Sequence, residues 1–267
     1  MTTELADGLS VVCASNPGPM TGPGTNQYLL GTRVGVQIDA APLDAENRRR
    51  LARAPARAER LVLTHIHPDH VGGAVDLGVP IAVHASRADC APGGRPLAPA
   101  TTLEDGDEIR YPGGRLLVVH TPGHESGHCC LYEPERRWLF TGDTVLSTGT
   151  SMIAPPDGNM IAYLASLRRL RGLALAVIFP GHGPPVTEPV ALLDEYLAHR
   201  LLRERQILDV LGAGPAAVDA LVARLYAGLH PALTWAAGLT VRAHLEKLEV
   251  EGAVVAPSGA GDRFRLA

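Results

Sequence analysis

The sequence has few aromatic residues, few cysteines and no long hydrophobic run. Phe, Trp and Tyr make up 4% of its 267 residues, so few side chains are present on which nucleobases could stack. Four cysteines, with Cys129 and Cys130 adjacent, exclude a disulfide-stapled scaffold and favour a reducing compartment. The longest strongly apolar stretch, residues 173–179, is too short to span a bilayer, and the first residues show no secretory signal. We therefore expect a cytoplasmic protein without membrane association.

An excess of positive charge is also missing. The formal net charge of the chain is −4, and residues 200–267 carry 8 basic and 7 acidic side chains. A protein that binds a phosphate backbone typically has a strongly basic surface. The composition therefore weakens a nucleic-acid interpretation, although it does not exclude a local basic patch.

Short apolar runs alternate with loops rich in Gly and Pro as far as about residue 185. Helices are expected over residues 44–53 and 159–171, where Asp44 and Asn159 are suitable N-cap residues. The apolar runs predict strands. They are residues 29–30, 34–38, 61–63, 81–83, 116–119, 129–132, 138–140 and 177–179. Many short strands between helices predict an α/β or α+β fold, with two sheets or one mixed sheet covered by helices.

The pattern changes after Pro189. A long amphipathic helix that ends at Gly212–Gly214 is followed by predicted helices at 215–226 and 239–252. Two short strands, 253–256 and 264–266, then complete the pattern of a winged helix. We predict a catalytic domain over residues 1–190, and a linker helix plus winged-helix domain over 191–267. The second domain could cap the first, bind a protein or bind nucleic acid.

Potential metal ligands follow one of the predicted strands. The segment 64–70 places three histidines and an aspartate within six residues, directly after the strand at 61–63, and Pro68 favours a turn within it. Several ligands around one point indicate a metal site rather than a solvated loop. The candidate ligands in this segment are His65, His67, Asp69 and His70.

Three other strand ends carry a potential ligand each: His124 in TPGH, Asp143 in TGD and His182 in PGHG. Each motif alone is weak, but four such segments together support a site for two metal ions. In this arrangement His65, His67 and His124 bind one ion. Asp69, His70 and His182 bind the other, and Asp143 bridges the two.

The motifs HxHxDH, TPGHxSGH, TGD and PGHG resemble those of the metallo-β-lactamase superfamily of hydrolases, over residues of about 10 to 185. The resemblance implies a four-layer αβ/βα sandwich with the metal ions at one edge between two sheets. Residues 24–29, the run 199–208 and the winged-helix pattern are similar to the lactamase-beta-2-like group. That group includes endoribonucleases acting on single-stranded RNA, thioesterases of polyketide pathways and many other hydrolases. The family often has a Gly two residues after the aspartate that follows its second strand. Here Asp39 is followed by Ala40 and Ala41. Whether Asp39 orients the metal loop, by which we mean the segment 64–70, is therefore open.

We expect a binuclear metal-dependent hydrolase, with hydroxide bridging two divalent ions and attacking an ester, thioester or similar bond. Zinc is the first choice, with Mn or Fe as alternatives. Asp69 is the expected catalytic residue, which orients the nucleophile and carries a proton towards the leaving group. One alternative is an endoribonuclease for single-stranded RNA, and another is a catalytically silent module that binds nucleic acid or protein. Asp143 stands where the best-known metallo-β-lactamases use Cys, which argues for a different substrate.

The remaining polar residues have weaker signals. His128 is expected to orient a ligand loop, and His120 to contact a ligand or to pack. We expect His84, His199, His230 and His244 to be structural or exposed to solvent. We expect Arg200, Arg203 and Arg205 to form a solvated helix face, with a role in attracting an anionic substrate as the alternative.

Overall fold

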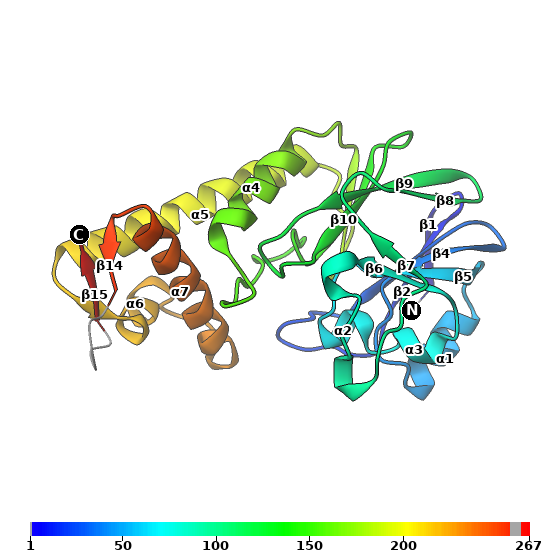
Figure 1. Ribbon diagram of the computed structural model, residues 1–267, viewed down its shortest axis with the longest axis horizontal. Helices are drawn as coiled ribbons and strands as arrows, with labels where there is room; N and C mark the ends of the chain where they lie inside the picture. Colours follow the sequence, from blue (N-terminus) through cyan, green and yellow to red (C-terminus); the bar gives the residue numbers. More distant parts are fainter. Residues whose placement is uncertain (1, 257–262) are drawn as a thin grey trace. The chain divides into compact units, whose positions relative to one another are not determined.

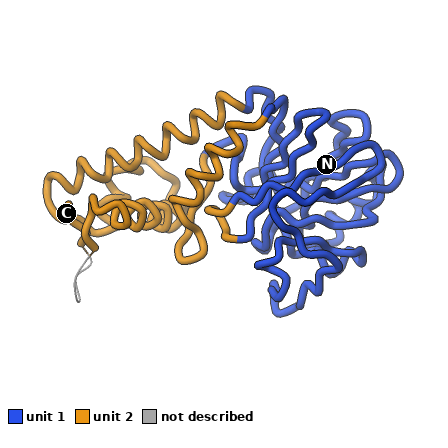
Figure 2. Tube along the Cα trace, turned by 45° about the horizontal axis from the view of Figure 1, so that its top comes forward, with its two compact units in different colours: residues 1–121, 127–149, 174–189 blue, residues 122–126, 150–173, 190–267 orange. Residues whose placement is uncertain are grey.

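The computed structural model describes residues 2–256 and 263–267. Its Cα trace divides into two compact units, which Figure 2 distinguishes by colour. Unit 1 contains the residues up to Thr121, together with Gly127–Gly149 and Ala174–Pro189. Unit 2 contains Pro122–Ser126, Thr150–Leu173 and the chain from Val190 onward. The predicted domain boundary at residue 190 stays a prediction.

Unit 1 contains a seven-stranded sheet whose strands lie side by side in their sequence order. The pairs from β1 to β4 are antiparallel, and those from β4 to β7 are parallel. The strands are β1 (Thr2–Ala6), β2 (Leu9–Cys13), β3 (Asn26–Leu30), β4 (Val34–Ile38), β5 (Arg57–Val62), β6 (Ile81–His84) and β7 (Thr101–Leu103).

A five-stranded sheet in the same unit has the order β12-β11-β10-β9-β8. Its strands pair antiparallel except for β11 and β12, which are parallel. The strands are β8 (Glu108–Tyr111), β9 (Gly114–His120), β10 (Cys129–Glu133), β11 (Trp138–Gly142) and β12 (Val177–Pro180).

The two sheets bury their apolar faces against each other. Tyr28 of the first sheet packs edge-on against Phe140 and Phe179 of the second, with ring centroids 5.1 and 5.7 Å apart. Burial of this kind contributes roughly 25 cal/mol per Å² of apolar surface and is the main stabilising term of the fold. The cluster also contains Leu9, Leu30, Val36, Ile38, Val62, Ala82, Leu103, Ile109, Leu116, Val118, Cys129 and Leu131.

Short helices pack on the outer face of the seven-stranded sheet, where a second apolar cluster includes Leu61, Val71 and Ala74. Asp44 caps the first of these helices by accepting a hydrogen bond from the backbone of Asn47, which confirms its predicted role. The helices of unit 1 are α1 (Ala45–Ala52), α2 (Pro68–Val71) and α3 (Ala74–Leu77), with 3-10 turns η1 (Ala85–Arg87) and η2 (Pro92–Gly94).

Unit 2 is mainly helical, and its long helix α5 is yellow in Figure 1. Asn159 caps α4 through the backbone N–H of Ala162, as predicted. Three very short strands beside the last helices form a sheet with the order β13-β15-β14. The elements are α4 (Met160–Arg171), α5 (Pro189–Gly212), β13 (Ala216–Ala217), α6 (Val218–Leu225), η3 (Pro231–Leu233), α7 (Thr234–Val250), β14 (Val254–Val255) and β15 (Arg263–Leu266).

Helix boundaries in unit 2 differ from the sequence prediction. The helix expected from residue 215 begins at Val218, because Ala216 and Ala217 pair with β15. The helix expected from residue 239 begins at Thr234, directly after η3. Residues 257–262, between the two strands predicted at 253–256 and 264–266, lie outside the described residues. Together with the two sheets of unit 1, these elements make the fold α+β.

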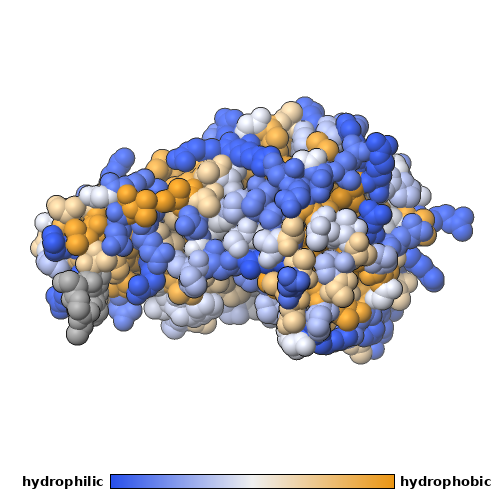
Figure 3. Space-filling model, viewed as in Figure 1, coloured by the Kyte–Doolittle hydropathy of each residue, from blue (hydrophilic) through white to orange (hydrophobic). Residues whose placement is uncertain are grey.

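No helix in the described part of the chain is long and apolar enough to cross a membrane. On the face drawn in Figure 3, hydrophilic residues cover most of the surface and hydrophobic residues lie between them.

Candidate metal centre

The predicted ligands lie directly after strands or in the loops between them. His65 and His67 follow β5, and α2 turns the chain so that Asp69 and His70 come next. Pro68 occupies the first turn of α2, where its missing N–H costs no hydrogen bond. The other three come from more distant strands: His124 from the β9–β10 connection, Asp143 from the end of β11 and His182 from the end of β12.

The structure brings these seven side chains into two groups that share Asp143. Within each group the potential ligand atoms all lie within 4.8 Å of one another. One group is His65, His67, His124 and Asp143, and the other is Asp69, His70, Asp143 and His182. The grouping matches the two-ion arrangement expected from the sequence, while the binding of metal by these residues stays a prediction.

Several short distances join the side chains of the second group. The Nε2 atoms of His70 and His182 lie 3.3 Å apart. His70 Nε2 lies 3.2 Å from Asp143 Oδ1, and His182 Nε2 lies 3.1 Å from Asp69 Oδ2. Two imidazole nitrogens and two carboxylates thus face one small volume. A cation bound there would neutralise the negative charge of the carboxylates.

The charges in this group shift one another's pKa. Burial lowers the pKa of His70, but the carboxylates of Asp143 and Asp39 outweigh burial and hold that pKa well above its usual value. Burial also lowers the pKa of His182, yet Asp143 and Asp69 raise it to about 9. Burial raises the pKa of Asp143, but the two histidines hold it well below its usual range. The Asp143 carboxylate is therefore ionised at neutral pH and requires a positive partner.

The Nδ1 atoms of the histidines hydrogen-bond away from the ligand groups. His70 Nδ1 donates to Asp39 Oδ2 at 2.7 Å, His124 Nδ1 to the Met152 carbonyl at 2.7 Å, and His182 Nδ1 to the Gly24 carbonyl at 3.3 Å. Such partners fix the tautomer of an imidazole, so that Nε2 is the nitrogen left to bind a metal ion.

Asp39 orients two residues of the metal loop, although the glycine that often follows this aspartate in the family is missing. Its carboxylate accepts the hydrogen bond from His70 and also accepts from the backbone N–H of Thr64 at 2.8 Å. The Thr64 hydroxyl donates to Asp39 Oδ2, so it accepts from His65 Nδ1 at 3.0 Å. Asp39 has a φ of 60°, in the left-handed region that Asp and Asn tolerate better than most residues. Asp39 therefore orients the segment 64–70, a role that the sequence left open.

Asn26 holds the loop that carries His182, a function that its sequence context alone did not predict. Its side-chain amide donates to the carbonyls of Pro180 at 3.0 Å and Gly183 at 2.8 Å. Its backbone N–H donates to the Gly181 carbonyl at 2.8 Å. In the sequence, Asn26 precedes the strand predicted at 29–30, and its only signal is the resemblance of residues 24–29 to the lactamase-beta-2-like group.

His128 contacts the loop that carries the candidate ligand Asp143. This contact confirms the prediction that His128 orients a ligand loop. Its Nε2 accepts a hydrogen bond from the backbone N–H of Asp143 at 3.2 Å. The hydroxyls of Thr121 and Thr144 lie 3.0 and 3.1 Å from its Nδ1. His128 is therefore a buried support of the Asp143 backbone.

Gly181 leaves room for the ligands. A Cβ atom on this residue would lie 2.6 Å from Asp143 Oδ1 and 2.7 Å from His70 Cε1. Any side chain here would displace two members of the second group, which explains the Gly before His182 in PGHG.

Other polar residues lie apart from both ligand groups. His84 and His120 stack with ring centroids 4.2 Å apart, and His244 is buried beside Glu204 in unit 2. The expectation of a solvated helix face is wrong for Arg200, which is 1% exposed because its guanidinium packs over Tyr163.

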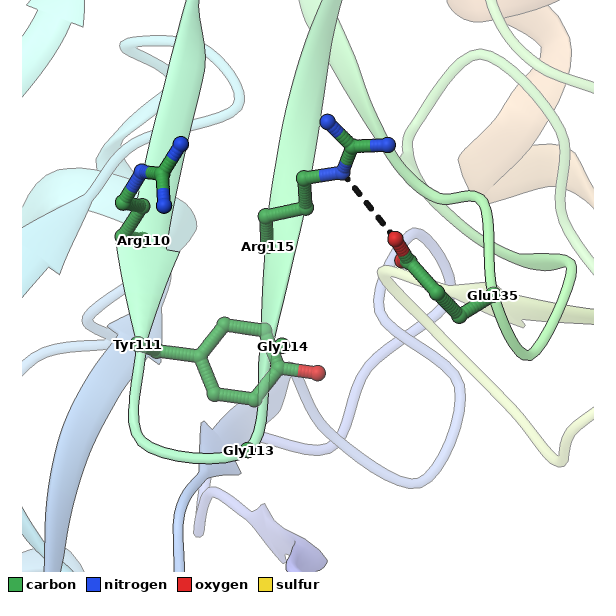
Figure 4. A pocket seen from close by; sticks show the side chains of 6 residues that line it. All are labelled: Arg110, Tyr111, Gly113, Gly114, Arg115 and Glu135. Atoms are coloured by element: carbon green, nitrogen blue, oxygen red, sulfur yellow. Dashed lines mark hydrogen bonds and ion pairs between the residues drawn. The ribbon is translucent and has the colours of Figure 1, made fainter.

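One surface pocket lies at the β8–β9 hairpin. Arg110, Tyr111 and Arg115 line it with Glu135, and Arg115 donates to Glu135 at 3.1 Å (Figure 4). Its lining residues include no histidine. The pocket therefore belongs to the hairpin surface and not to the candidate metal centre.

The donor set fits divalent metal ions. Imidazole nitrogen suits Zn, Fe and Cu, and a group with added carboxylates also suits Mn. Outer hydrogen-bond partners on the Nδ1 atoms are a regular feature of metal-binding histidines. Both the donors and their partners are present here.

Comparison with known proteins relates both parts of the chain to known families. Residues 21–182 match the model of the metallo-beta-lactamase superfamily, and residues 217–262 match that of the beta-lactamase associated winged helix domain. The chain is 32% identical to the beta-lactamase-like protein 2 homolog of Caenorhabditis elegans, over 95% of this chain and 88% of that protein.

Solved structures show the same fold. A metallo-beta-lactamase family protein from Thermus thermophilus superposes with a TM-score of 0.84 at 25% identity, covering 99% of this chain and 100% of that one. A second protein, solved in a di-iron-bound form, has a TM-score of 0.55 at 27% identity, covering 67% of this chain and 96% of that one. Because the superfamily model matches more than half of its length, this chain belongs to the metallo-β-lactamase superfamily of hydrolases.

Proposed function

We propose that this protein hydrolyses a small ester or thioester with two divalent metal ions, zinc being the first candidate. The observation that carries the proposal is the pair of ligand groups that share Asp143, each with its potential ligand atoms within 4.8 Å. Iron is the main alternative, since one similar protein was solved in a di-iron-bound form.

His65, His67 and His124 would hold the first ion, and Asp69, His70 and His182 the second, with Asp143 between them. When bound, the ions supply a nucleophile by lowering the pKa of water to about 7, and they stabilise the negative charge that develops on the substrate oxygen. The chain itself supplies the fixed positions of the ligands through the hydrogen bonds on their Nδ1 atoms.

Asp69 is the residue best placed to act on the reacting groups. Its side chain is 27% exposed, whereas those of His70 and His182 are 0% and 6% exposed. Burial raises the pKa of Asp69, but His182 and His70 together lower it by more. The net shift is downward, so Asp69 is a carboxylate at neutral pH. A reachable carboxylate at this position can orient the attacking water and accept its proton for transfer to the leaving group.

A small substrate is favoured over RNA on charge and composition. The residues from 200 onward are close to neutral, and aromatic side chains are scarce in the chain as a whole. Counterion release and stacking, the two main contributions to binding of single-stranded RNA, are therefore weak here.

A substrate panel tests the proposal. Purified protein would be assayed with p-nitrophenyl esters, thioesters, phosphodiesters and labelled single-stranded RNA, each with and without chelator, after its metal content has been measured. We expect close to two equivalents of metal and chelator-sensitive hydrolysis of an ester or thioester. Less than one equivalent after purification without chelator would contradict the metal site. Chelator-sensitive cleavage of RNA alone would replace the small substrate by single-stranded RNA.

A further inference from the structure

The hydrogen-bond partner of His124 lies in a segment without regular secondary structure. The Met152 carbonyl accepts a hydrogen bond from His124 Nδ1 at 2.7 Å, and residues 151–154 form neither helix nor strand. By contrast, the partner of His70 is Asp39, which directly follows strand β4. A carbonyl in an irregular segment can fix the imidazole only if something else holds that segment.

Two helices of unit 2 hold the segment on either side of Met152. Arg200 of α5 donates from Nη2 to the Ser151 carbonyl at 2.5 Å. Thr240 of α7 accepts from the backbone N–H of Ile153 at 3.3 Å, and its hydroxyl donates to the Ala236 carbonyl at 3.1 Å. The residues before and after Met152 are thus each tied to a helix, which fixes the direction of its carbonyl.

Burial of the Arg200 guanidinium costs more free energy than a single hydrogen bond to a carbonyl returns. It is 1% exposed, its guanidinium lies over the Tyr163 ring at 5.2 Å, and its buried Nε atom makes no hydrogen bond. Among the described residues it forms no ion pair. Burial of a charge without a carboxylate partner opposes folding, so packing alone would be better served by an apolar residue of this length.

We propose that Arg200 is a positioning residue for the metal ligand His124, and that it acts through the backbone of Ser151 and Met152. Thr240 supports the same segment from the other side. This inference rests on the proposed function, because it requires His124 to bind a metal ion. It assigns to the C-terminal helices a part in building the metal site, besides any role of the winged-helix segment in binding a partner.

Arg200→Met tests the proposal, because Met keeps much of the length and removes the donor. Arg203→Met is the matched control. Arg203 lies on the same helix, its guanidinium packs over the Tyr226 ring at 4.3 Å, and it donates to the Leu225 carbonyl at 2.7 Å. It therefore has the same kinds of contact as Arg200, but none of them is with the segment 151–153.

The primary measurement is metal binding by the full-length chain, followed with Co(II) as a spectroscopic probe. For Arg200→Met we expect the dissociation constant of the ion bound by His124 to rise about 10–100-fold, with an altered Co(II) absorption spectrum, and little change for the other ion. Arg203→Met should keep the affinities and the spectrum of the unchanged protein even if it unfolds at a lower temperature. Arg200→Lys should restore part of the affinity, since it retains a donor.

A second variant covers the case in which Arg200→Met does not fold. Thr240→Val keeps the shape of the side chain and removes the acceptor for Ile153, so it should weaken the same ion and speed up hydrogen exchange at His124 Nδ1. Unchanged Co(II) affinity and spectrum in the folded variants would overturn the positioning role while leaving the metal site intact. If the unchanged protein itself bound no Co(II), the proposed function would fail, and the positioning role with it.

Discussion

The Nε2 atoms of His70 and His182 lie 3.3 Å apart, although 112 positions separate the two residues in the chain. Both rings are buried, and both point at the carboxylates of Asp69 and Asp143. Two imidazoles whose pKa values are raised would repel each other at this distance once both are protonated. The arrangement becomes favourable when a divalent cation takes the place of the protons.

Removal of one ligand should empty one of the two metal positions. We expect His67→Ala to lower the metal content from about two equivalents to about one and to abolish most hydrolytic activity, because two imidazoles and one carboxylate would remain in the first group. Elemental analysis of purified protein measures the change. His230→Ala is a suitable control because this residue only caps the 3-10 turn η3. Retention of full activity and two equivalents by His67→Ala would exclude His67 as a ligand.

Asp39→Asn should weaken the second ion without disturbing the backbone. Asn tolerates the φ of 60° at this position, but its amide cannot accept hydrogen bonds from His70 and Thr64 through both side-chain atoms. His70 would lose the partner that fixes its tautomer, so we expect a loss of about 10–100-fold in metal affinity. Titration against a competing chelator measures it. Asp76→Asn, which removes only an exposed ion pair with Arg95, should bind metal as before.

Gly181→Ala should disturb the metal site by steric conflict. The added methyl group would lie 2.6 Å from Asp143 Oδ1, and the displacement needed is expected to cost about 1–3 kcal/mol of unfolding free energy and at least one equivalent of metal. Thermal unfolding and metal analysis follow the two effects. Gly172→Ala serves for comparison, since the nearest atom to a Cβ there would be the Arg169 carbonyl oxygen, at 3.3 Å. Equal metal content in both variants would show that the space beside Asp143 is not needed.

Protonation of His199 should lower the free energy of unfolding of the metal-free protein as the pH falls. Burial, with the charges of Arg200 and Arg203, lowers its pKa from the ordinary value of 6.5 to about 4 in the folded chain. Between pH 6.5 and 4 the unfolded chain therefore binds more protons at this residue than the folded chain, so its contribution to stability falls as pH decreases through that window. His199→Gln should flatten the decrease. Urea unfolding in the presence of chelator at several pH values compares the two chains, and parallel pH profiles would contradict this role.

Local features of the fold were predictable because they depend on neighbours in sequence. Asp44 and Asn159 cap their helices as expected, since an N-cap needs only a short polar side chain before a helical run. The beginning of α7 was placed five residues too late, because its first turn follows η3 and lacks a side-chain cap. Strands β1 and β2 were not predicted, since their short and partly polar sequences form strands by pairing with β3 and each other.

The residue types that meet at the candidate metal centre were predictable from the motifs. Histidine and aspartate at the ends of strands converge because strand ends collect at one edge of a sheet, so the motifs were enough to name all seven positions that the structure groups. The residues that support these ligands became identifiable only from contacts in the folded chain. Asp39, Asn26 and Arg200 act through contacts 31, 154 and 49 positions away in the chain, and no local pattern records such distances. Arg200 in particular has the sequence context of an exposed helix position, and only packing against Tyr163 and the Ser151 carbonyl buries it.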